Sequence, residues 1–296
     1  MTVDPGEPRL TETSMSSDIW LALRSDKLSM IGMAVIIALL LVAVFAPWLA
    51  PFPEEGRGVA NPDALTMAPS AEHWFGTDAL GRDVLSRVII GSRSSLLIPF
   101  VVVLLAIAIG APLGAIAGFR GGWTDRIIMR TTDLFLAFPS TLLAVAITAS
   151  IGRGLRNAAL ALVISWWPWY TRLVRGVASS LREAHFVEAA RSIGLSRWQI
   201  VRKHILPNSL TPIVVQGTID LGIVVIAMGG LAFIGLGTQP PLPDWGLMIS
   251  EGRSLILSAW WVATFPGVVM LVAVFSFNVM GDALRDLFDP RQRRRR

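Results

Sequence analysis

Long apolar stretches alternate with short polar segments along almost the whole chain. Six of the stretches are long enough to cross about 30 Å of hydrocarbon as a helix, which takes about 20 residues. The six lie at residues 29–49, 94–118, 132–151, 155–173, 209–236 and 260–281. The strict alternation of apolar and polar residues that a membrane β-barrel requires runs through none of them. The pattern therefore predicts an all-α polytopic membrane protein with six transmembrane helices.

The apolar stretches divide the chain into five parts. Residues 1–28 form a polar cytoplasmic segment without the pattern of a cleavable signal peptide, and 29–49 form the first transmembrane helix. A loop at 50–93, expected on the outer side of the membrane, contains an amphipathic helix. Residues 94–281 form a core of five helices, and 282–296 form a basic cytoplasmic tail.

Composition and charge agree with a membrane protein. Hydrophobic residues make up 53% of the 296 residues and charged residues only 16%, whereas a soluble domain has about 25% charged residues. If both termini are cytoplasmic, most of the 26 lysines and arginines fall on the cytoplasmic side, as the positive-inside rule requires. The basic net charge of +5 then indicates a basic cytoplasmic surface and not nucleic-acid binding. The absence of cysteine excludes disulfides and thiolate catalysis.

One polar segment interrupts the apolar pattern. The sequence VEAARSIGLSRWQIVRKHILPN, residues 187–208, predicts two short helices joined by a tight corner at Gly194, a residue suited to the left-handed position after a helix. Ser196 opens the second helix with the S-x-x-Q spacing of a capping box. Trp198 lies on the apolar face of that helix, and Pro207 ends it. The segment is either a rigid docking elbow on the cytoplasmic side or a helical loop lying on the membrane.

The same segment resembles the EAA loop of bacterial ABC importer permeases. The pattern of that family is E-A-A, three residues, G, nine residues and I-x-L-P, and here His204 stands in place of the isoleucine, with Ile205 one position later. In that family the loop, which corresponds to residues 176–207, carries a coupling helix that sits in a groove of a cytoplasmic ATPase. The resemblance implies that the ATPase-coupling residues are Glu188, Ala189, Ala190, Gly194, Ser196, Trp198 and Pro207.

Two further stretches are similar to dipeptide and oligopeptide permeases. HWFGTDALGRDVLSRVIIGSRSSL, residues 73–96, matches their H-x-F-G-T-D-x-x-G-R-D-x-x-S-R segment, and GDALRDLFDPR, residues 281–291, matches their C-terminal ending. The chain thus resembles the C-type permease subunit over almost its whole length. The resemblance implies the type I ABC importer permease fold with a cytoplasmic coupling helix, in a bacterial plasma membrane.

The resemblance also implies partners and a substrate. A second permease subunit, two cytoplasmic ABC ATPase subunits and an extracytoplasmic peptide-binding protein are expected. Di- or oligopeptides are the expected substrate, and a nickel chelate or haem is the alternative within the family. This chain is expected to bind no cofactor, with ATP and Mg²⁺ on the ATPase subunits. Neither Lys27 nor Lys203 follows a glycine, as the lysine of a phosphate-binding P-loop does.

Residues 73–96 also predict an amphipathic helix. Thr77 or Asp78 is placed to cap it, and Asp83 and Arg87, four residues apart, are expected to pair on its surface. The helix is then either a docking surface for the binding protein or the partner permease, or an interfacial helix that lies flat on the membrane.

Asp220 is the one carboxylate clearly within a predicted span. Facing lipid would cost it about 2.5–3.5 kcal/mol, so it faces a pathway or a neighbouring helix. With Gln216 it is expected either to line the route of a zwitterionic peptide or to make a structural hydrogen bond between helices. A lone carboxylate is a poor proton relay, which argues against an ion-coupled secondary transporter, the rival function.

An intramembrane enzyme is the third class of function. The metalloprotease motif H-E-x-x-H and the serine-hydrolase motif G-x-S-x-G are both absent from the sequence. His73, His185 and His204 lie in polar segments and are expected to face solvent. No catalytic or metal-binding residue is therefore expected.

Overall fold

The computed structural model describes residues 27–288, and the regular structure among them is helical, with one isolated β-bridge. Residues 1–26 of the predicted N-terminal segment and residues 289–296 of the predicted tail lie outside this range. In chain order the helices are α2 (Lys27–Leu49), α3 (Pro53–Gly56), η1 (Pro62–Ala64), α4 (Val84–Ser92), η2 (Arg93–Leu97), α5 (Ile98–Arg120), α6 (Gly122–Leu136), α7 (Ser140–Ile151), α8 (Leu155–Leu181), α9 (His185–Ser192), α10 (Arg197–Ile200), η3 (Val201–Ile205), α11 (Leu206–Asn208), α12 (Leu210–Phe233), α13 (Trp245–Gly252), η4 (Arg253–Leu255) and α14 (Trp261–Phe288). Of these, η1 and η4 are 3₁₀ turns, whereas η2 and η3 are π turns.

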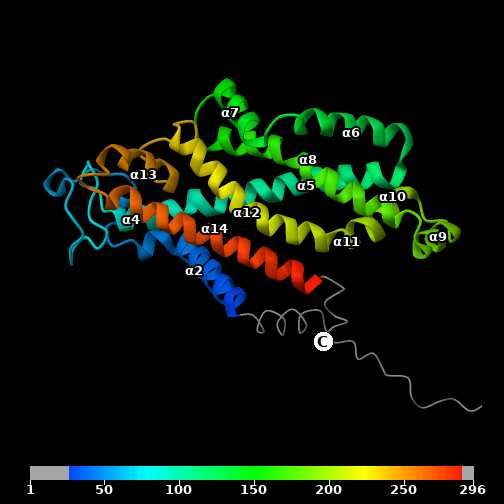
Figure 1. Cartoon of the computed structure of the whole chain (residues 1–296), viewed down its shortest axis with the longest axis horizontal. Helices are drawn as coiled ribbons and strands as arrows, with labels where there is room; N and C mark the ends of the chain where they lie inside the picture. Colours follow the sequence, from blue (N-terminus) through cyan, green and yellow to red (C-terminus); the bar gives the residue numbers. More distant parts are fainter. Residues whose placement is uncertain (1–26, 289–296) are drawn as a thin grey trace, which may run out of the picture.

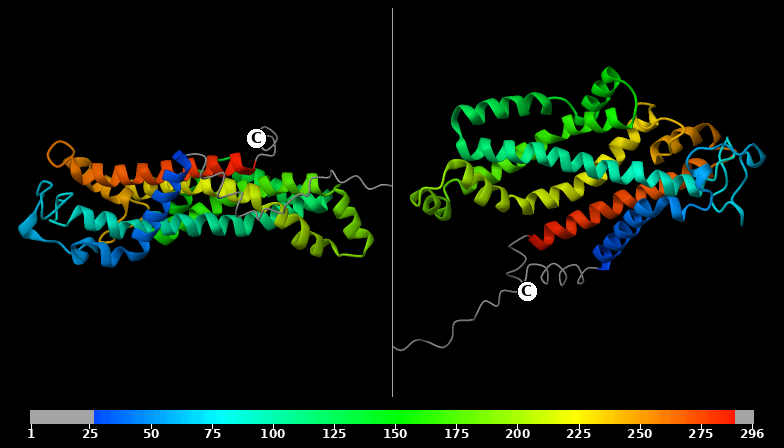
Figure 2. Two further views of the ribbon diagram at one scale, coloured as in Figure 1. Left: turned by 90° about the horizontal axis from the view of Figure 1, so that it is seen from below. Right: turned by 180° about the vertical axis from the view of Figure 1, so that it is seen from behind.

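The helices form an elongated bundle in which the chain passes back and forth between two ends (Figures 1 and 2). One end, named here the loop end, carries residues 50–83 and α13. The opposite end, named the elbow end, carries α9 and α10. α2 begins and α14 ends toward the elbow end, so the two ends of the described chain lie on the same side (Figure 2).

Four helical segments of the described chain are long and apolar enough to cross a membrane. They are α2, the unit from α4 to α5, α12 and α14, and they coincide with the predicted spans at 29–49, 94–118, 209–236 and 260–281. α6 and α7 make a fifth span if they count as one. α8 is long enough, but its C-terminal half contains Arg172 and Arg175 and it is not in this set. The total of six therefore stays a prediction.

The third predicted span, at 132–151, is not one continuous helix. α6 and α7 meet at an angle of 83°, and α7 begins directly after Pro139. Proline lacks the backbone N–H that continues a helix, and its ring disfavours helical backbone at the preceding residue. Pro139 therefore ends α6 and lets α7 start in a new direction.

α6 is fastened to α8 by two ion pairs. Arg175 donates from Nε and Nη2 to the two carboxylate oxygens of Asp125, at 2.6 and 2.7 Å. Arg172 Nη2 donates to Asp133 Oδ1 at 2.7 Å. Charged side chains are expensive inside hydrocarbon, so these pairs favour a position for α6 at the aqueous boundary.

The amphipathic helix before the second span is not a separate element. α4, η2 and α5 run on as one helical unit from Val84 to Arg120, so α4 does not lie flat as a helix of its own. The predicted cap at Thr77 or Asp78 is wrong, because a β-bridge between Thr77 and Asp83 holds this stretch in a turn. Asp83 is the N-cap instead, and it accepts from the Ser86 N–H at 2.7 Å.

Three clusters of buried apolar side chains form the core. One lies between α5, α7, α8 and α12, and the second joins α2, α4, α12, α13 and α14 toward the loop end. The third fastens α9, α10 and η3 to α5 and α8 at the elbow end. The candidate site is thus built directly onto the two helices at the centre of the bundle.

α5 and α8 cross closely because glycines line their contact. Gly110, Gly114 and Gly118 are spaced four apart on α5, which places them on one face. A Cβ atom on Gly114 would lie 2.4 Å from the carbonyl oxygen of Thr171 and 2.9 Å from the backbone nitrogen of Arg175. Small residues at this spacing let two membrane helices approach backbone to backbone. The spacing was readable in the sequence but was not among the predictions.

α2 is joined to the bundle where Pro47 interrupts its hydrogen bonds. Proline at this position cannot donate to the carbonyl of Ala43, four residues earlier. Arg93 from η2 replaces the missing donor, with Nε at 2.9 Å from the Ala43 oxygen and Nη2 at 2.8 Å from the Val44 oxygen. The guanidinium therefore satisfies carbonyls that would otherwise be exposed to lipid.

Candidate functional site

The segment from α9 to α11, residues 185–208 and named here the elbow, has the predicted corner at Gly194. Gly194 has a φ of +83°, in the left-handed region. Its N–H donates to the Arg191 carbonyl at 3.0 Å, and the Leu195 N–H donates to the Ala190 carbonyl at 3.1 Å. This pair of hydrogen bonds is the Schellman motif that ends a helix. The corner is therefore fixed by the backbone itself.

The predicted capping box at the start of α10 is also confirmed. The Gln199 N–H donates to the Ser196 hydroxyl at 3.3 Å, and the Ser196 N–H donates to the Gln199 side-chain oxygen at 2.8 Å. Each side chain thus satisfies a backbone donor that a helix start leaves free. α9 and α10 are capped at the same corner, which makes the elbow a stiff unit.

The buried face of the elbow differs from the predicted one. Trp198 is 53% exposed and lies outside the buried face, whereas Ile200, Val201 and Ile205 are buried in the third core cluster. The reason is the π turn η3, because i to i+5 hydrogen bonding brings residues five apart, such as Ile200 and Ile205, onto one face.

Pro207 does not end the helix, which corrects the prediction. It lies in the first turn of α11, where a missing N–H costs little, and the chain passes through Ser209 into α12. The elbow is therefore directly continuous with the fifth predicted span.

The outer face of the elbow exposes several of the predicted coupling residues. Glu188, Ala189, Gly194 and Trp198 are exposed, while Ala190 is buried against α5 and α8. Two apolar side chains that the prediction did not include, Phe186 and Ile193, are exposed with them, and Ile193 is 80% exposed. Apolar side chains gathered on a rigid exposed surface are typical of a protein–protein contact. Their signal in the sequence was apolar residues within an otherwise polar segment.

Asp220 is 4% exposed and sits between α8 and α12. The Tyr170 hydroxyl donates to its Oδ2 at 2.6 Å, and Gln216 Nε2 donates to its Oδ1 at 3.0 Å. Of the two predicted roles, the hydrogen bond between helices is present. The role of Asp220 and Gln216 in a pathway stays a prediction, because a pathway between two subunits is not visible in one chain.

A buried ionic network at the loop end was not predicted. Arg87 is 1% exposed, and its Nη1 donates to Asp78 Oδ2 at 2.6 Å and to Glu251 Oε2 at 2.7 Å. Arg82 Nε also donates to Asp78 Oδ2, at 2.7 Å. The predicted pair between Asp83 and Arg87 is therefore wrong. Buried charges of this kind need partners, and here the partners tie the loop at 50–83 to α13.

His73 is 3% exposed, so the expectation that it faces solvent is wrong. Its Nδ1 lies 2.9 Å from Asp83 Oδ1, which is the N-cap of α4. His185 is exposed and His204 is half-buried at the elbow. Among residues 27–288 the His, Asp and Glu side chains form no group of three or more that could hold a metal ion.

α13 is a further element that the apolar pattern did not predict. Asp244 caps it by accepting from the N–H groups of Gly246 at 3.0 Å and Leu247 at 3.3 Å, and the Ser95 hydroxyl donates to it at 3.1 Å. Burial raises the pKa of the Asp244 carboxyl above its ordinary value, although the hydrogen bonds that it accepts work against that shift. The cap joins α13 to η2.

Two family descriptions match the chain. The family "Binding-protein-dependent transport system inner membrane component" matches residues 110–294, and "N-terminal TM domain of oligopeptide transport permease C" matches residues 14–69. The chain belongs to the family of binding-protein-dependent transport system inner membrane components. It is a permease subunit of an ABC importer in the inner membrane, and ATP is hydrolysed on a separate subunit. A permease of this kind works with a partner permease, ATPases and a substrate-binding protein.

Three relatives are 42% identical to the chain. The dipeptide transport system permease protein DppC of Alkalihalophilus pseudofirmus matches over 99% of this chain and 97% of its own length. The probable D,D-dipeptide transport system permease protein DdpC of Escherichia coli matches over 92% of this chain and 90% of its own. The glutathione transport system permease protein GsiD of Escherichia coli matches over 93% and 90%. The predicted likeness to C-type dipeptide and oligopeptide permeases is confirmed.

Solved structures have the same fold. Two structures described as inward facing conformations of the MetNI methionine ABC transporter match with TM-scores of 0.54 and 0.55. They cover 68% and 70% of this chain and 96% and 97% of their own, at 21% and 24% sequence identity. At this identity the likeness concerns the fold alone, and it confirms the predicted permease fold.

Proposed function

We propose that the chain forms half of the translocation pathway of an importer for short peptides, together with a second permease subunit. The three relatives are named for a dipeptide, a D,D-dipeptide and glutathione, and all of these are short peptides. That shared substrate class supports peptides over a nickel chelate or haem. Uptake of labelled dipeptides by the complete transporter, with nickel chelates and haem as competitors, tests it. Competition by haem or a nickel chelate, but by no peptide, would overturn the proposal.

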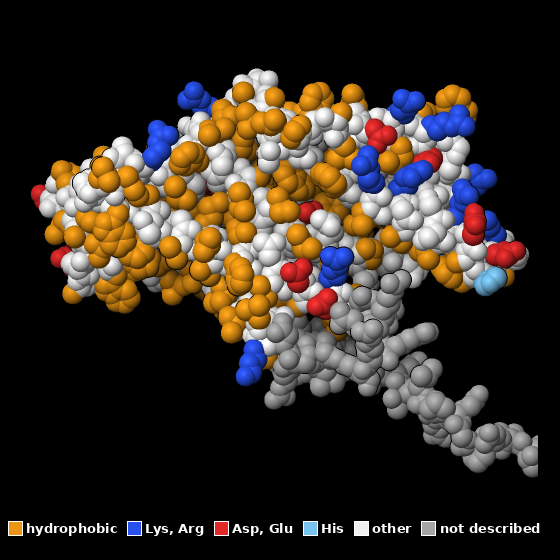
Figure 3. Space-filling view, in the orientation of Figure 1, with side chains coloured by type: hydrophobic (Ala, Val, Ile, Leu, Met, Phe, Trp, Pro, Cys, Tyr) orange, Lys and Arg blue, Asp and Glu red, His pale blue; other side chains and the backbone are white. Residues whose placement is uncertain are grey.

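The elbow end is proposed to face the cytoplasm, with both termini on that side. Lysine and arginine side chains gather on this end of the molecule (Figure 3), and the surface between the two ends is largely apolar. Positive charge is retained on the cytoplasmic side of membrane proteins. This orientation places the loop at 50–83 and α13 outside the cell, where a substrate-binding protein would deliver.

The elbow is proposed to be the contact for two cytoplasmic ATPase subunits, one on each permease. The single observation that carries this is a stiff, doubly capped corner with apolar side chains on its exposed face. Because Ala190, Val201 and Ile205 pack on α5 and α8, movement of the elbow is transmitted to the central helices. ATP binding would move the elbow and switch the pathway between its two openings. ATP and Mg²⁺ are proposed to stay on the ATPases, with no cofactor on this chain.

The absence of cysteine from the sequence makes a clean cross-linking test possible. Ile193→Cys, carrying a photoactivatable cross-linker, is expected to join an ATPase subunit in membranes that contain the complete transporter. Leu257→Cys is the matched control, because Leu257 is fully exposed and follows η4, the turn directly after α13 of the loop end.

A membrane-impermeant maleimide reports the orientation of the same two variants. It should label Leu257→Cys in intact cells and Ile193→Cys only after lysis. Labelling of Ile193→Cys in intact cells would refute the orientation. Correct orientation without any cross-link to an ATPase would refute the docking contact.

A further inference from the structure

A half-open cavity of about 610 Å³ lies at the elbow end, between the elbow and the C-terminal ends of α5 and α8. Four arginines line it: Arg120, Arg182, Arg191 and Arg197. Glu183 is the one acidic residue of the lining, and it is largely exposed. The floor is apolar and consists of Phe119, Leu195 and Ile200. The cavity is large enough for a small organic ligand.

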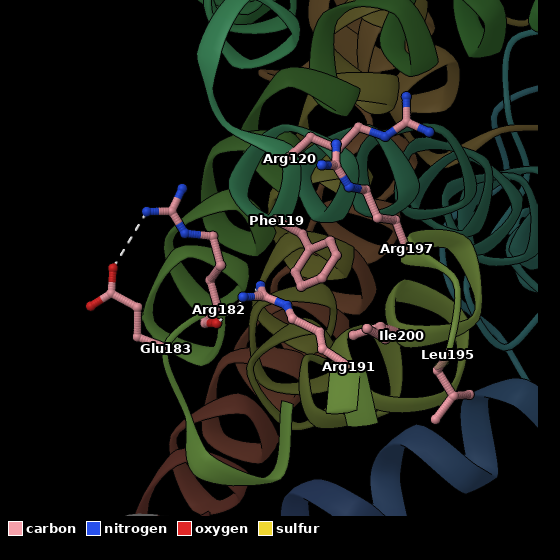
Figure 4. Close-up of a pocket in the computed structure, with 8 residues that line it drawn as sticks. All are labelled: Phe119, Arg120, Arg182, Glu183, Arg191, Leu195, Arg197 and Ile200. Atoms are coloured by element: carbon pink, nitrogen blue, oxygen red, sulfur yellow. Dashed lines mark hydrogen bonds and ion pairs between the residues drawn. The ribbon is translucent and has the colours of Figure 1, made fainter. Parts of the chain in front are cut away.

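The arginines approach the cavity from separate elements (Figure 4). Arg182 and Arg191 lie on one side of the Phe119 ring, and Arg120 and Arg197 lie on the other side. Arg191 is held in place, because its guanidinium carbon lies 5.3 Å from the centre of the Phe119 ring and its Nη2 donates to the Arg182 carbonyl at 3.3 Å. The cation over the ring is a favourable contact.

Two of the arginines have no partner of their own. Within the described chain, the side chains of Arg120 and Arg197 make no hydrogen bond and no ion pair, whereas the Arg182 side chain pairs with the neighbouring Glu183 at 3.4 Å. Carbonyls at the C-terminal ends of α5 and α8 offset part of the positive charge. Four guanidinium groups against one exposed carboxylate still leave an excess of positive charge around a concave surface, which attracts anions.

We propose that this cavity binds a phosphate-bearing anion, with its organic part on the apolar floor. Guanidinium groups match phosphate oxygens with paired hydrogen bonds, and a phosphate presents oxygens in several directions at once. A carboxylate is planar and is satisfied by one guanidinium fork, so it would leave the arginines on the opposite side unused. The phosphate is either the headgroup of an anionic lipid or a soluble phosphate compound.

The bound anion would join the elbow to the bundle. Arg191 and Arg197 belong to the elbow, whereas Arg120 and Arg182 belong to the ends of α5 and α8. One anion shared between them adds polar contacts to the apolar packing of Ile200 and Ala190 beneath. This proposal goes beyond the peptide-import function and is tested on the full-length chain without ATPases.

The test compares two double variants of the full-length chain at about 0.15 M salt, where distant charges are screened. Arg120→Gln/Arg197→Gln removes the two unpartnered arginines of the cavity. Arg126→Gln/Arg130→Gln removes the same charge from exposed positions on α6 that do not line it. The probes are pyrophosphate, measured by calorimetry in neutral detergent, and phosphatidylglycerol in phosphatidylcholine nanodiscs, measured by retention of lipid in native mass spectrometry.

Loss of affinity by about tenfold for each arginine is expected in the cavity variant, against less than threefold in the α6 variant. Binding of phosphatidylglycerol alone identifies a lipid headgroup, and binding of pyrophosphate identifies a soluble phosphate. Equal loss in both variants, or no binding of either probe by the unmodified chain, overturns the proposal.

Discussion

Single residues fix the geometry of the elbow, and Gly194 is the most sensitive of them. Gly194→Val places a β-branched residue at φ +83°, where L-residues pay about 1–2 kcal/mol and branched ones more. Nothing lies within 4 Å of an added Cβ, so the penalty comes from the backbone and not from a clash. We expect peptide uptake to fall at least tenfold while the amount of protein in the membrane stays unchanged.

Gly194→Asn is the matched control for that prediction, because asparagine adopts the left-handed conformation more readily than other residues. It should retain most of the uptake. Both variants are measured by uptake of labelled dipeptide and by co-purification of the ATPases. Wild-type uptake by the valine variant would contradict a coupling role for the corner.

Replacement of Asp220 is expected to lower both the stability of the bundle and transport. Asp220→Leu leaves the Tyr170 hydroxyl and the Gln216 amide without their shared partner inside the bundle. An unsatisfied buried polar group costs about 1–3 kcal/mol, so the thermal unfolding temperature in detergent should fall. Transport should weaken, and the ATPases should remain bound because the elbow is untouched. Unchanged stability and unchanged transport together would contradict this account.

Asp220→Asn separates the structural role from the pathway role. The amide can still accept from Tyr170 and bond with Gln216, but it carries no charge. If Asp220 is only a link between α8 and α12, this variant keeps both stability and uptake. If its charge meets the substrate, uptake of zwitterionic peptides falls while the unfolding temperature is retained.

Between elements, the close crossing of α5 and α8 is the most demanding contact. Gly114→Val should destabilise the bundle by about 1–3 kcal/mol or more, because the new side chain meets the backbone of Thr171 and Arg175. Gly176→Val is the matched control within α8, since no atom lies within 4 Å of its added Cβ. Thermal unfolding in detergent measures both variants. Equal losses in the two would mean that helix propensity, and not the crossing, decides the effect.

Local signals in the sequence were enough to predict features that depend only on the backbone and side chains of neighbouring residues. The corner at Gly194 and the capping box at Ser196 depend on residues within a few positions, and both are as predicted. Whether a proline ends a helix, in contrast, depends on the packing around it. Pro139 and Pro207 carry the same local signal, yet one ends a helix and the other lies inside a helical run. Only packing around them decides between these outcomes.

The same limit applies to charged side chains. Asp83 and Arg87 have the spacing of a surface pair, but Arg87 pairs with Glu251, which is distant in the sequence. The spacing of two charged residues along one helix does not show whether either of them pairs with a side chain of another element. For the same reason Asp220 was recognised as a buried carboxylate, but its partner Tyr170 on α8 was not.

For the whole molecule, the chain is the permease, and ATP is hydrolysed on a separate subunit. We expect the purified chain to show no ATP hydrolysis above that of an empty-detergent control, because its sequence has no P-loop lysine. Adding the ATPase subunits should restore hydrolysis. Turnover that remains with the chain alone, after removal of trace ATPases by a second purification step, would contradict the division of labour.

The unbroken helical unit from Val84 to Arg120 has a mechanical consequence. Its 37 residues correspond to a length of about 55 Å, enough to reach from the ionic network at one end to the cavity floor at the other. A movement at either end is therefore transmitted along one continuous helical unit. The π turn η2 and Pro112, which cannot donate a backbone hydrogen bond within α5, are the places where this unit can bend.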